Sequence, residues 1–549
     1  MRKIFTNTLL KNKYFIWILL YCFAHILLLL DQGVYWDDWS LHLGTSNEII
    51  QNFHDNGLVI YGYVHAFLQQ FPYSIFIYNF LTFIIYLFAG FLLYKILSKL
   101  KIFNDFDLFF IVTIFLIAPL NITRVAMIIF PYSLSYFLFF FSLYLLQINL
   151  EKDKISILIR VCSLVLFFTT FQIASFLVFY LLALLLIYFY EKRKGRNIIT
   201  ILLRNIDYVI LPIFYWIIKS IYFKTSGPYI DYNTITIYNA VFLFPYRIVT
   251  SFYSSIIEVI NNSLVSFDVF WFIISLILFF QFNKNINNDN SILNKSDEKH
   301  SNDKIYFSLS FLFILVSMIP YLFVGKMVLN EGWDIRNQLL LPLGFSFFIY
   351  FGLKLFLNLF TANRIIQIIT VSVFISGFLI ININYYLDFN RDWIKQLSII
   401  ENLKLSDEIK NNHSFYLVDN TENLNAINRT YSVLEFSGMM TATYGNSKRI
   451  AINDKQIYRE VLSNSIHIWL GYSSLKDYKQ LQNPQYKIEI EYGPFKLDRF
   501  TQFRLMLLKF WNKQKYKEIV SNIVKIRVIP IQNLTWKDLV KDVDANIQF

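Results

Sequence analysis

Long runs of apolar residues recur along the chain and constrain its fold more than any other feature. A helix needs about 20 such residues to cross the hydrocarbon core of a bilayer, and about eleven runs approach or reach that length. They lie at residues 14–30, 74–94, 107–119, 126–148, 155–170, 173–190, 206–223, 266–282, 305–323, 338–357 and 364–383. Only 16% of the 549 residues are charged, against about 25% in an average soluble domain. The sequence therefore predicts a polytopic α-helical membrane protein.

Two of these runs require interpretation. The stretch 155–190 is too long for one span, and polar residues at 169–172 divide it, so we expect two helices there. The first run follows a basic N-terminal segment, as a signal peptide does, but no small-x-small cleavage site precedes Asp31. We therefore expect it to be retained as an anchor.

Lysine and arginine are distributed unevenly between alternate loops. Segment 31–73 contains neither. One set of loops holds Lys95, Lys99, Lys101, Lys152, Lys154, Lys192, Arg193, Lys194, Arg196, Arg204, Lys284, Lys295, Lys299 and Lys304. Cytoplasmic loops are enriched in these residues, which predicts a cytoplasmic N-terminus and, with an odd number of spans, an outer C-terminal segment. This bias accounts for the net charge of +12 without a nucleic-acid partner. The Asn-rich and Lys-rich composition indicates a bacterium, and the predicted location is its inner (cytoplasmic) membrane.

The chain divides into two predicted domains. Residues 1–383 carry the spans, with a first outer loop at 31–73, and residues 384–549 form an extracytoplasmic domain. Hydrophobicity falls in the second part, where short β-like runs alternate with helical patterns. The β-like runs are Phe415–Val418, Arg449–Ile452, Lys487–Tyr492 and Lys525–Ile531, and the helical patterns lie at 392–410 and 501–524. We expect a small α/β or α+β domain there.

Two adjacent carboxylates, Asp37 and Asp38, open the first outer loop soon after the first span. The loop contains no Lys or Arg to pair with them, and Trp36 and Trp39 flank them. Like charges this close raise the pKa of one carboxyl group. Such a pair can take a proton from an acceptor hydroxyl or hold a divalent cation. A turn within an aromatic interface belt is the alternative interpretation.

The order of these features resembles that of the GT-C superfamily of membrane glycosyltransferases. Its members combine a cytoplasmic N-terminus, an acidic residue in a long first outer loop, many further spans and a C-terminal outer domain. They include protein O-mannosyltransferases, aminoarabinose transferases, oligosaccharyltransferase catalytic subunits and O-antigen glucosyltransferases. The likeness covers the topology of most of residues 1–383 and one short motif. The Trp-flanked Asp-Asp pair departs from the Asp-Glu and Asp-x-Asp motifs of these members, so metal dependence stays open.

The resemblance implies a hexosyltransferase that uses a polyprenyl-phosphate-linked sugar as donor and inverts the anomeric centre. The catalytic base of the superfamily maps to Asp37, with Asp38 as its partner, and both would ligate any divalent metal. The implied partners are the lipid bilayer, the donor, and a glycan, lipid or protein acceptor. A donor synthase and a flippase would act upstream.

The segment Asn330–Asn337 is the second candidate site. It places Arg336 close to Glu331 and Asp334 in the last outer loop before the final helix pair. The planar guanidinium binds phosphate oxygens bidentately, and the resemblance assigns outer-loop Arg or His residues to the donor phosphate. Arg336 is the first candidate for that role and Lys326 the second. Ion pairing of Arg336 with Glu331 or Asp334 is the alternative.

Three other cations lie at or near outer membrane positions. Arg124 ends a span, where it either contacts the donor phosphate or snorkels to the interface. Lys219 lies near the outer end of an apolar run, and Arg247 lies in an outer segment. Ionisable groups in such places are candidate functional residues. Residues 236–260 are amphipathic and are expected to lie along the interface.

Side chains near the two candidate sites are predicted sugar ligands. They are Trp36, Trp39, His42, Glu331 and Asp334. His42 follows Asp38 by four residues, so the two share a face of any helix that begins there. It is a candidate to ligate a metal or carry a proton. His54 and His65 lie in the same loop, but their spacing is not a zinc pattern.

The sequence contains no nucleotide-binding or hydrolase signature of the Gly-rich kinds. No nucleotide cofactor is therefore expected, as suits a reaction outside the cytoplasm. Two rival functions stay open, an O-antigen or polysaccharide polymerase and a lipid-linked glycan flippase or transporter. Transporters carry their charged groups near the midplane of the bilayer in repeated halves, whereas the acidic pair here lies in an outer loop.

Overall fold

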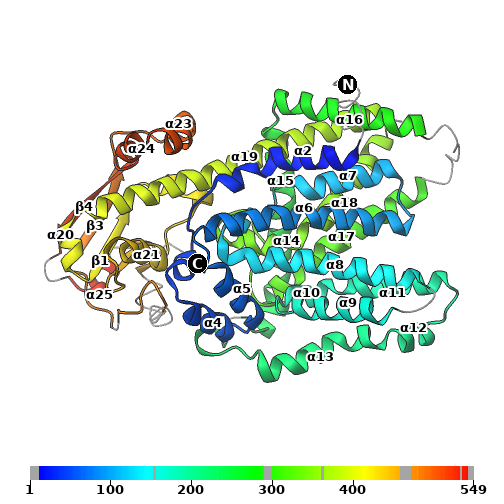
Figure 1. Cartoon of the computed structure of the whole chain (residues 1–549), viewed down its shortest axis with the longest axis horizontal. Coiled ribbons are helices and arrows are strands. Elements are labelled where there is room, and N and C mark those ends of the chain that lie inside the picture. The colour runs from blue at the N-terminus through cyan, green and yellow to red at the C-terminus, as the bar shows by residue number, and fades with distance from the viewer. Residues whose placement is uncertain are drawn as a thin grey trace.

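The structure, a computed structural model, describes residues 12–152, 156–230, 233–289, 300–359, 364–457, 461, 472–478, 480–531 and 534–541. It has two parts, a bundle of long helices and a smaller domain built on a β-sheet, which we call the sheet domain (Figure 1). Helix α19, Arg364–Leu403, runs from the bundle into the sheet domain.

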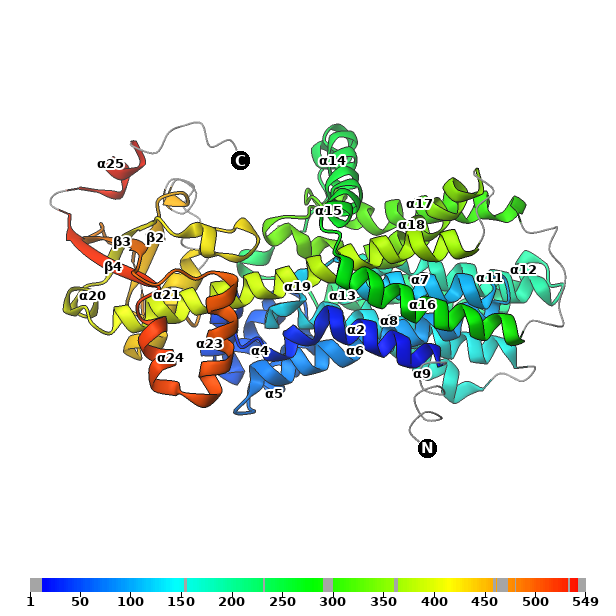
Figure 2. The same ribbon diagram turned by 90° about the horizontal axis from the view of Figure 1, so that it is seen from above.

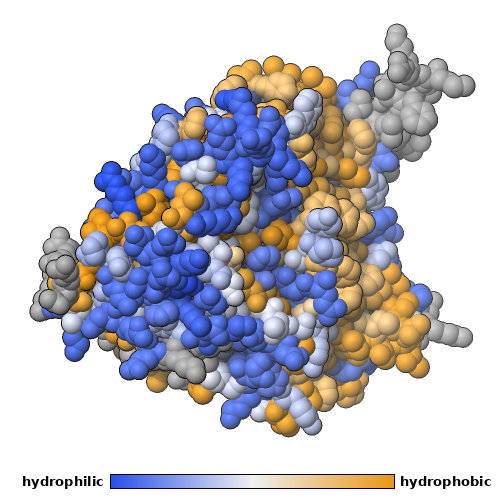
Figure 3. Space-filling view, turned by 60° about the vertical axis from the view of Figure 1, so that its left-hand side comes forward, coloured by the Kyte–Doolittle hydropathy of each residue, from blue (hydrophilic) through white to orange (hydrophobic). Residues whose placement is uncertain are grey.

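The bundle helices run along the long axis of the molecule and lie side by side in both views (Figures 1 and 2). They are α2 (Lys13–His25) continued by η1 (Ile26–Leu30), α6 (Ser74–Leu100), α7 (Asp105–Ile117), α8 (Phe130–Glu151), α9 (Ile157–Thr170), α10 (Ser175–Phe179), α11 (Leu181–Arg193), α12 (Ile198–Arg204), α13 (Ile206–Tyr222), α16 (Val269–Asp289), α17 (His300–Phe323), α18 (Leu341–Asn358) and α19. Hydrophobic surface covers the bundle flank, whereas the sheet domain is largely hydrophilic (Figure 3). An apolar flank of this kind suits a bilayer, where backbone groups are satisfied within each helix.

Within the described residues, seven helices are long and apolar enough to cross a membrane, or up to nine if each bent pair is one span. The prediction of about eleven spans counted two further helices, which are short. Helix α7 has 13 residues and α9 has 14. Helix α7 is buried along almost its whole length, so other helices, and not lipid, satisfy its apolar surface. Apolar composition alone does not separate such a helix from a lipid-exposed span.

The helical segment before α16 turns away from the bundle axis. It consists of α14 (Phe244–Phe252), η6 (Tyr253–Glu258) and α15 (Val259–Val265). Its axis is bent by 102° from that of α16, and α14 projects from the bundle in Figure 2. Much of the predicted interfacial segment, 236–260, lies in it. Its course across the bundle axis is the one expected of a helix that lies along a membrane surface.

The sheet domain contains a four-stranded mixed sheet in the order β2-β1-β3-β4. The strands are β1 (Ser414–Asp419), β2 (Ile450–Asn453), β3 (Tyr486–Tyr492) and β4 (Val524–Pro530). Strand β1 pairs in parallel with β2 and β3, and β3 pairs antiparallel with β4. All four predicted strands are confirmed. The domain helices are α20 (Asp407–Asn411), α21 (Val433–Tyr444), α23 (Arg499–Trp511), α24 (Lys513–Val520) and α25 (Trp536–Lys541).

The sheet domain shares a helix with the bundle. The boundary expected between residues 383 and 384 falls inside α19, which continues without a break to Leu403. The far part of α19 binds β4 directly, since Ser398 Oγ accepts the Val524 N–H at 3.0 Å. The predicted helix 392–410 is therefore the end of α19 followed by α20. The predicted helix 501–524 is divided into α23 and α24.

The first loop, residues 31–73, fills the space between the bundle and the sheet domain (Figure 1). It forms three helices, α3 (Asp38–Leu43), α4 (Ser46–Asp55) and α5 (Val59–Leu68). Helix α21 of the sheet domain packs closely on α3. A Cβ atom added at Gly438 of α21 would lie 2.7 Å from Cβ of Trp39.

We expect Gly438→Ala to destabilise the protein, because the added methyl group overlaps Trp39 and the two helices must separate. Overpacking of this kind costs about 1–3 kcal/mol. Thermal unfolding of the purified protein in detergent measures the effect. The control is Ala442→Ser on an exposed position of the same helix, which should leave the unfolding temperature unchanged. Equal unfolding temperatures for both variants would show that the α3–α21 contact is loose.

Candidate active site

The two adjacent carboxylates have different environments. Asp38 is fully buried, and its carboxylate accepts backbone N–H groups from Met127 at 2.9 Å, Ile128 at 2.7 Å and Tyr35 at 3.3 Å. Met127 and Ile128 begin the 3₁₀-helix η3 (Met127–Ile129), whose first N–H groups have no partner within the helix. Asp38 thus anchors the first loop to the segment between α7 and α8.

Asp37 is the half-buried member of the pair. It precedes α3 at the N-cap position and follows Trp36, whose φ of 50° lies in the left-handed region. A bulky residue holds that conformation only where its surroundings enforce it. Here the Trp36 N–H donates to Glu435 Oε1 of α21 at 3.0 Å. The resulting turn directs Asp38 inward and leaves Asp37 at the wall of a cavity.

The cavity has a volume of about 120 Å³ and lies between the first loop, the segment before α8 and the loop that carries Arg336. Asp37 and Arg336 both line it. Its other polar lining comes from Ser40, Asn52, Asn56, Tyr132, Tyr229 and Tyr472. Apolar side chains such as Phe53 and Trp333 complete the wall. Hydroxyl, amide and aromatic groups around one charged pair are the donors, acceptors and flat surfaces that a sugar ring can contact.

The electrostatic surroundings of Asp37 favour a carboxyl group that can exchange a proton. Burial raises the pKa of Asp37 above its ordinary value, and the positive charge of Arg336 opposes that shift. A carboxylate whose pKa is raised is a stronger base than an exposed one. Asp37 and Arg336 come from loops about 300 residues apart in the sequence. They bring one acidic and one basic side chain into the same cavity.

Arg336 belongs to the 3₁₀ segment η7 (Gly332–Gln338). Its guanidinium carbon lies 4.8 Å from the ring centroid of Trp333, and Trp333 in turn lies 4.0 Å from Trp36, centroid to centroid. Asn337 Nδ2 donates to the Met327 carbonyl at 2.6 Å and fixes the segment. A direct aromatic contact thus links the two candidate sites.

The other charged residues of this segment lie outside the cavity lining. Glu331 is exposed, and Asp334 accepts Asn337 Nδ2 at 3.2 Å. Burial raises the pKa of Asp334, whereas Arg336 and Lys326 lower it. Arg336 therefore acts on both Asp334 and Asp37, so an interaction with Asp334 does not remove it from the cavity that Asp37 also lines. Glu331 and Asp334 are not placed to bind a sugar in the cavity.

Lys326, the second candidate for the donor phosphate, donates to Asn233 Oδ1 at 2.7 Å and does not line the cavity. Two other candidate cations also lie away from it. Lys219 stacks on Trp216 at 5.3 Å, and Arg247 donates to Asn239 at 2.9 Å.

The structure places Arg124, a candidate for the donor phosphate, away from the cavity. Its side chain is buried and does not line the cavity. The guanidinium stacks on Tyr86 at 4.5 Å and contacts His25 at 3.0 Å and Tyr386 at 3.4 Å. A guanidinium enclosed by aromatic rings cannot reach a phosphate in the cavity without a large rearrangement. Arg124 thus contacts α2, α6 and α19.

Trp39 and the histidines are also separate from the cavity. Trp39 is buried, and its Nε1 donates to Gln396 Oε1 of α19 at 3.1 Å. His42 is exposed beside the Trp39 ring, with the centroids 6.3 Å apart. His65 is buried and bonded to Tyr78 at 2.7 Å, while His54 is exposed. The predicted sugar contacts of Trp39 and His42 are not supported by these positions.

Sequence reasoning missed several cavity residues. Tyr229, in the segment after α13, hydrogen-bonds through its hydroxyl to the Tyr472 hydroxyl of the sheet domain, and both line the cavity. Asn52 and Asn56, from α4 and the turn after it, also line the cavity. Nothing in the local sequence marks these residues, because only the fold brings 229 and 472 together.

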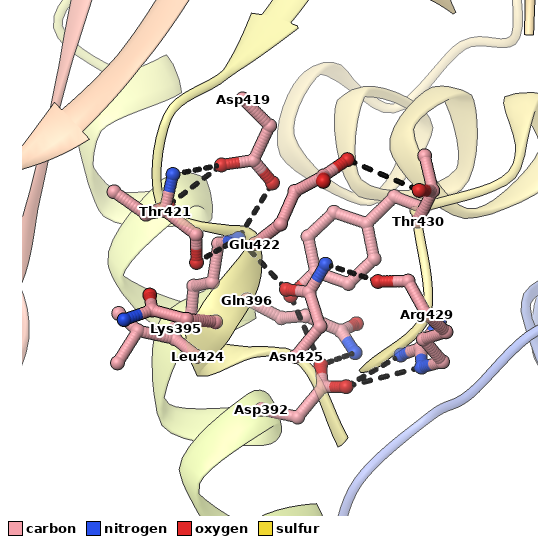
Figure 4. A network of polar contacts seen from close by, with 12 residues as sticks. Asp392, Lys395, Gln396, Asp419, Thr421, Glu422, Leu424, Asn425, Arg429 and Thr430 are labelled. Carbon is pink, nitrogen blue, oxygen red and sulfur yellow. Dashed lines mark hydrogen bonds and ion pairs between the residues drawn. The ribbon is translucent and has the colours of Figure 1, made fainter. Parts of the chain in front are cut away.

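A buried ionic network around Arg429 and Lys395 joins α19 to the sheet domain (Figure 4) and reaches Trp36 of the first loop. Arg429 pairs with Asp392 of α19 at 2.8 Å and with Glu435. These three side chains are almost fully buried. The Arg429 guanidinium also lies 4.9 Å from the Trp36 ring centroid. The network therefore fixes the ring that contacts Trp333 in the cavity wall.

A second buried cation extends the network. Lys395 Nζ of α19 binds Asp419 at 2.6 Å, Asn425 at 2.7 Å and the Thr421 carbonyl at 3.1 Å. Each charge thus has a charged partner and further hydrogen bonds, which is the condition under which buried ions are tolerated. These contacts hold the end of β1 and the segment after it against α19.

No protein-family model matches the chain, and a search of the curated proteins found no match. The geometry of the site is therefore the basis for a functional proposal.

We expect Asp38→Asn to destabilise the protein and Asp37→Asn to leave its stability nearly unchanged. Both Asp38 oxygens accept backbone N–H groups, so an amide NH₂ at either position faces another donor. An unsatisfied buried group costs about 1–3 kcal/mol. Thermal unfolding of both variants in detergent measures the difference. An equal loss for the two variants would contradict the division of roles between the carboxylates.

We expect Arg429→Met to lower the free energy of unfolding by about 3–5 kcal/mol, because it leaves Asp392 and Glu435 buried without their cation. The matched control is Arg391→Met, since Arg391 pairs with Asp388 at 3.3 Å in a partly exposed position. An exposed pair contributes about 0–1 kcal/mol. Denaturant unfolding followed by tryptophan fluorescence reports both. A small loss for Arg429→Met would mean that the network does not hold Trp36.

Proposed function

We propose that this protein is a membrane glycosyltransferase of the GT-C type. It transfers a sugar from a polyprenyl-phosphate donor to a cell-envelope glycan or another acceptor on the outer face of a bacterial inner membrane. The observation that carries the proposal is that Asp37 and Arg336 line the same cavity at the end of an apolar helix bundle. A base and a guanidinium in one cavity suit a displacement in which a proton is lost and a phosphate leaves.

Asp37 is the proposed general base. Its carboxylate takes the proton of the acceptor hydroxyl while the acceptor oxygen forms a bond to the anomeric carbon. The bond between that carbon and the phosphate oxygen breaks, and the electron pair leaves with the polyprenyl phosphate. A single displacement inverts the anomeric centre. The raised pKa of Asp37 supports this role, because proton transfer is most effective when the pKa of the base approaches the working pH.

Arg336 is the proposed partner of the leaving phosphate. Its planar guanidinium can bind two phosphate oxygens and offset the charge that builds on them. The contact with Trp333 holds the side chain in place before substrate arrives. Trp36, whose ring contacts Trp333, is a positioning residue in this scheme and not a sugar ligand.

The residues present do not suit a resident divalent metal. Asp38, which the sequence offered as a second ligand, has backbone N–H groups on both oxygens. Among the described residues, no group of three His, Cys, Asp or Glu side chains could hold a metal ion. No step of the proposed reaction is therefore assigned to a metal.

The position of the cavity favours a lipid-linked donor. The cavity lies where the bundle meets the first loop and the sheet domain, and Tyr472 of the sheet domain lines it. A polyprenyl chain can remain in the bilayer while its phosphate enters at this level. The sheet domain lies beyond the cavity, where an acceptor glycan would approach.

We expect Asp37→Asn to abolish transfer of labelled sugar from membrane lipid to endogenous glycan, while the labelled lipid accumulates. The amide cannot accept the hydroxyl proton, so the loss should exceed about 100-fold, the usual contribution of a general base. Matched expression and folding are verified by fluorescence-detected gel filtration. Full activity of Asp37→Asn would refute the base assignment. A wild-type protein that joins whole repeat units, or moves lipid-linked glycan without transfer, would instead favour a polymerase or a flippase.

The pH profile tests the link between Asp37 and Arg336. The base acts only when deprotonated, so transfer should fall as the pH drops through the pKa of Asp37. Arg336 lowers that pKa, and therefore Arg336→Gln should move the acid limb of the profile to higher pH as well as weaken donor binding. Arg336→Lys keeps the charge and should leave the limb in place. An unmoved limb in Arg336→Gln would show that another group sets it.

A further inference from the structure

Helix α23 of the sheet domain carries an exposed apolar face. The face consists of Phe500, Phe503, Leu507, Phe510 and Trp511, whose exposed fractions lie between 53% and 87%. At 100° per residue these five positions fall within about a third of the helix circumference. The opposite side is buried against the rest of the domain through Gln502 and Leu505. Five large side chains on one solvent-facing stripe are more than a soluble surface helix normally exposes.

Basic residues border this apolar face. Arg499 and Arg504 flank it on either side of the helix. The next helix, α24, adds Lys513, Lys515 and Lys517. An apolar stripe with aromatic side chains, bordered by Lys and Arg, is the pattern of helices that lie in the interface of an anionic membrane.

Both ends of α23 contact residues that lie close to the end of the first apolar span. At its start, Arg499 pairs with Asp388 of α19 at 3.0 Å, and near its end Lys509 donates to Gln32. Gln32 lies two residues after Leu30, the end of the first apolar span. Asp388 lies two residues after Tyr386, which contacts His25 of that same span. The helix also crosses the direction of α19 in Figure 2.

We propose that α23 lies on the outer-leaflet surface of the membrane that the bundle spans, with its aromatic face among the headgroups. Arg504 and the exposed Lys513 and Lys515 of α24 then contact anionic lipid phosphates. The proposal is independent of the reaction in the cavity. It continues the apolar flank of the bundle onto the sheet domain, so the domain rests on the membrane along α23 as well as being held by α19. That contact keeps the sheet domain at a constant height above the bilayer.

Site-directed spin labelling of the full chain in nanodiscs with anionic lipid tests this placement. Cys22 and Cys162 are first replaced by serine, and labels are attached at Phe503→Cys and Leu507→Cys. The matched control is Leu405→Cys, an exposed leucine beyond the far end of α19. All three positions are exposed, so the substitutions should not perturb folding. Collision with oxygen reports lipid contact, and collision with a water-soluble nickel chelate reports solvent contact.

We expect nickel access at 503 and 507 to be several-fold lower than at 405, with oxygen access correspondingly higher. Adding Arg504→Glu should raise nickel access at 503, because the substituted side chain repels anionic headgroups. Equal nickel access at all three positions would overturn the proposal. Spin–spin broadening at 503 would also overturn it, because that result would place a second copy of the chain, and not lipid, on this face.

Discussion

The Asp38 carboxylate is the contact on which the arrangement of the cavity depends. It binds the first two N–H groups of η3 and the Tyr35 N–H, so a single side chain joins the first loop to the entry of α8. Without it, three backbone donors would be buried without a partner. The fixed position of α3 then places Asp37 and Ser40 on one side of the cavity and Ile128 and Ile129 on another. The acidic residue next to the proposed base therefore holds the first loop against the segment before α8.

The sheet domain contributes to the same geometry from the other side. Glu435 holds the Trp36 N–H, Gln396 holds the Trp39 indole, and Tyr35 donates to the Phe389 carbonyl at 2.8 Å. Helix α19 connects these contacts, because it begins in the bundle and ends under the sheet. The sheet domain therefore helps to hold the first loop in position. Its buried Arg429 lies against the Trp36 ring, which contacts Trp333, and Trp333 in turn contacts Arg336.

Local patterns predicted much of the fold, and the reasons for success and failure are physical. The four strands follow from short β-branched and aromatic runs, and each apolar run forms a helix. The status of α7 could not be predicted, because burial among other helices and exposure to lipid select the same apolar residues. Charge in unusual places drew attention to Asp37 and Arg336, and both line the cavity. The Tyr229–Tyr472 contact and the burial of Arg124 arise from tertiary packing, which leaves no local sequence signal.

Asp37 and Asp38 also show how a loop without Lys or Arg can hold two adjacent carboxyl groups. Considered alone, Asp37 and Asp38 repel each other and one must gain a proton. In the fold, Arg336 from a distant loop lowers the pKa of Asp37. Burial and the neighbouring Asp37 raise the pKa of Asp38 to about 8, although three backbone N–H groups oppose that shift. The compensating charge for Asp37 is shared with the cavity and not enclosed by the protein. A ligand that carries a phosphate would therefore compete with Asp37 for Arg336, and its arrival would raise the basicity of the carboxylate at the moment when a proton must be accepted.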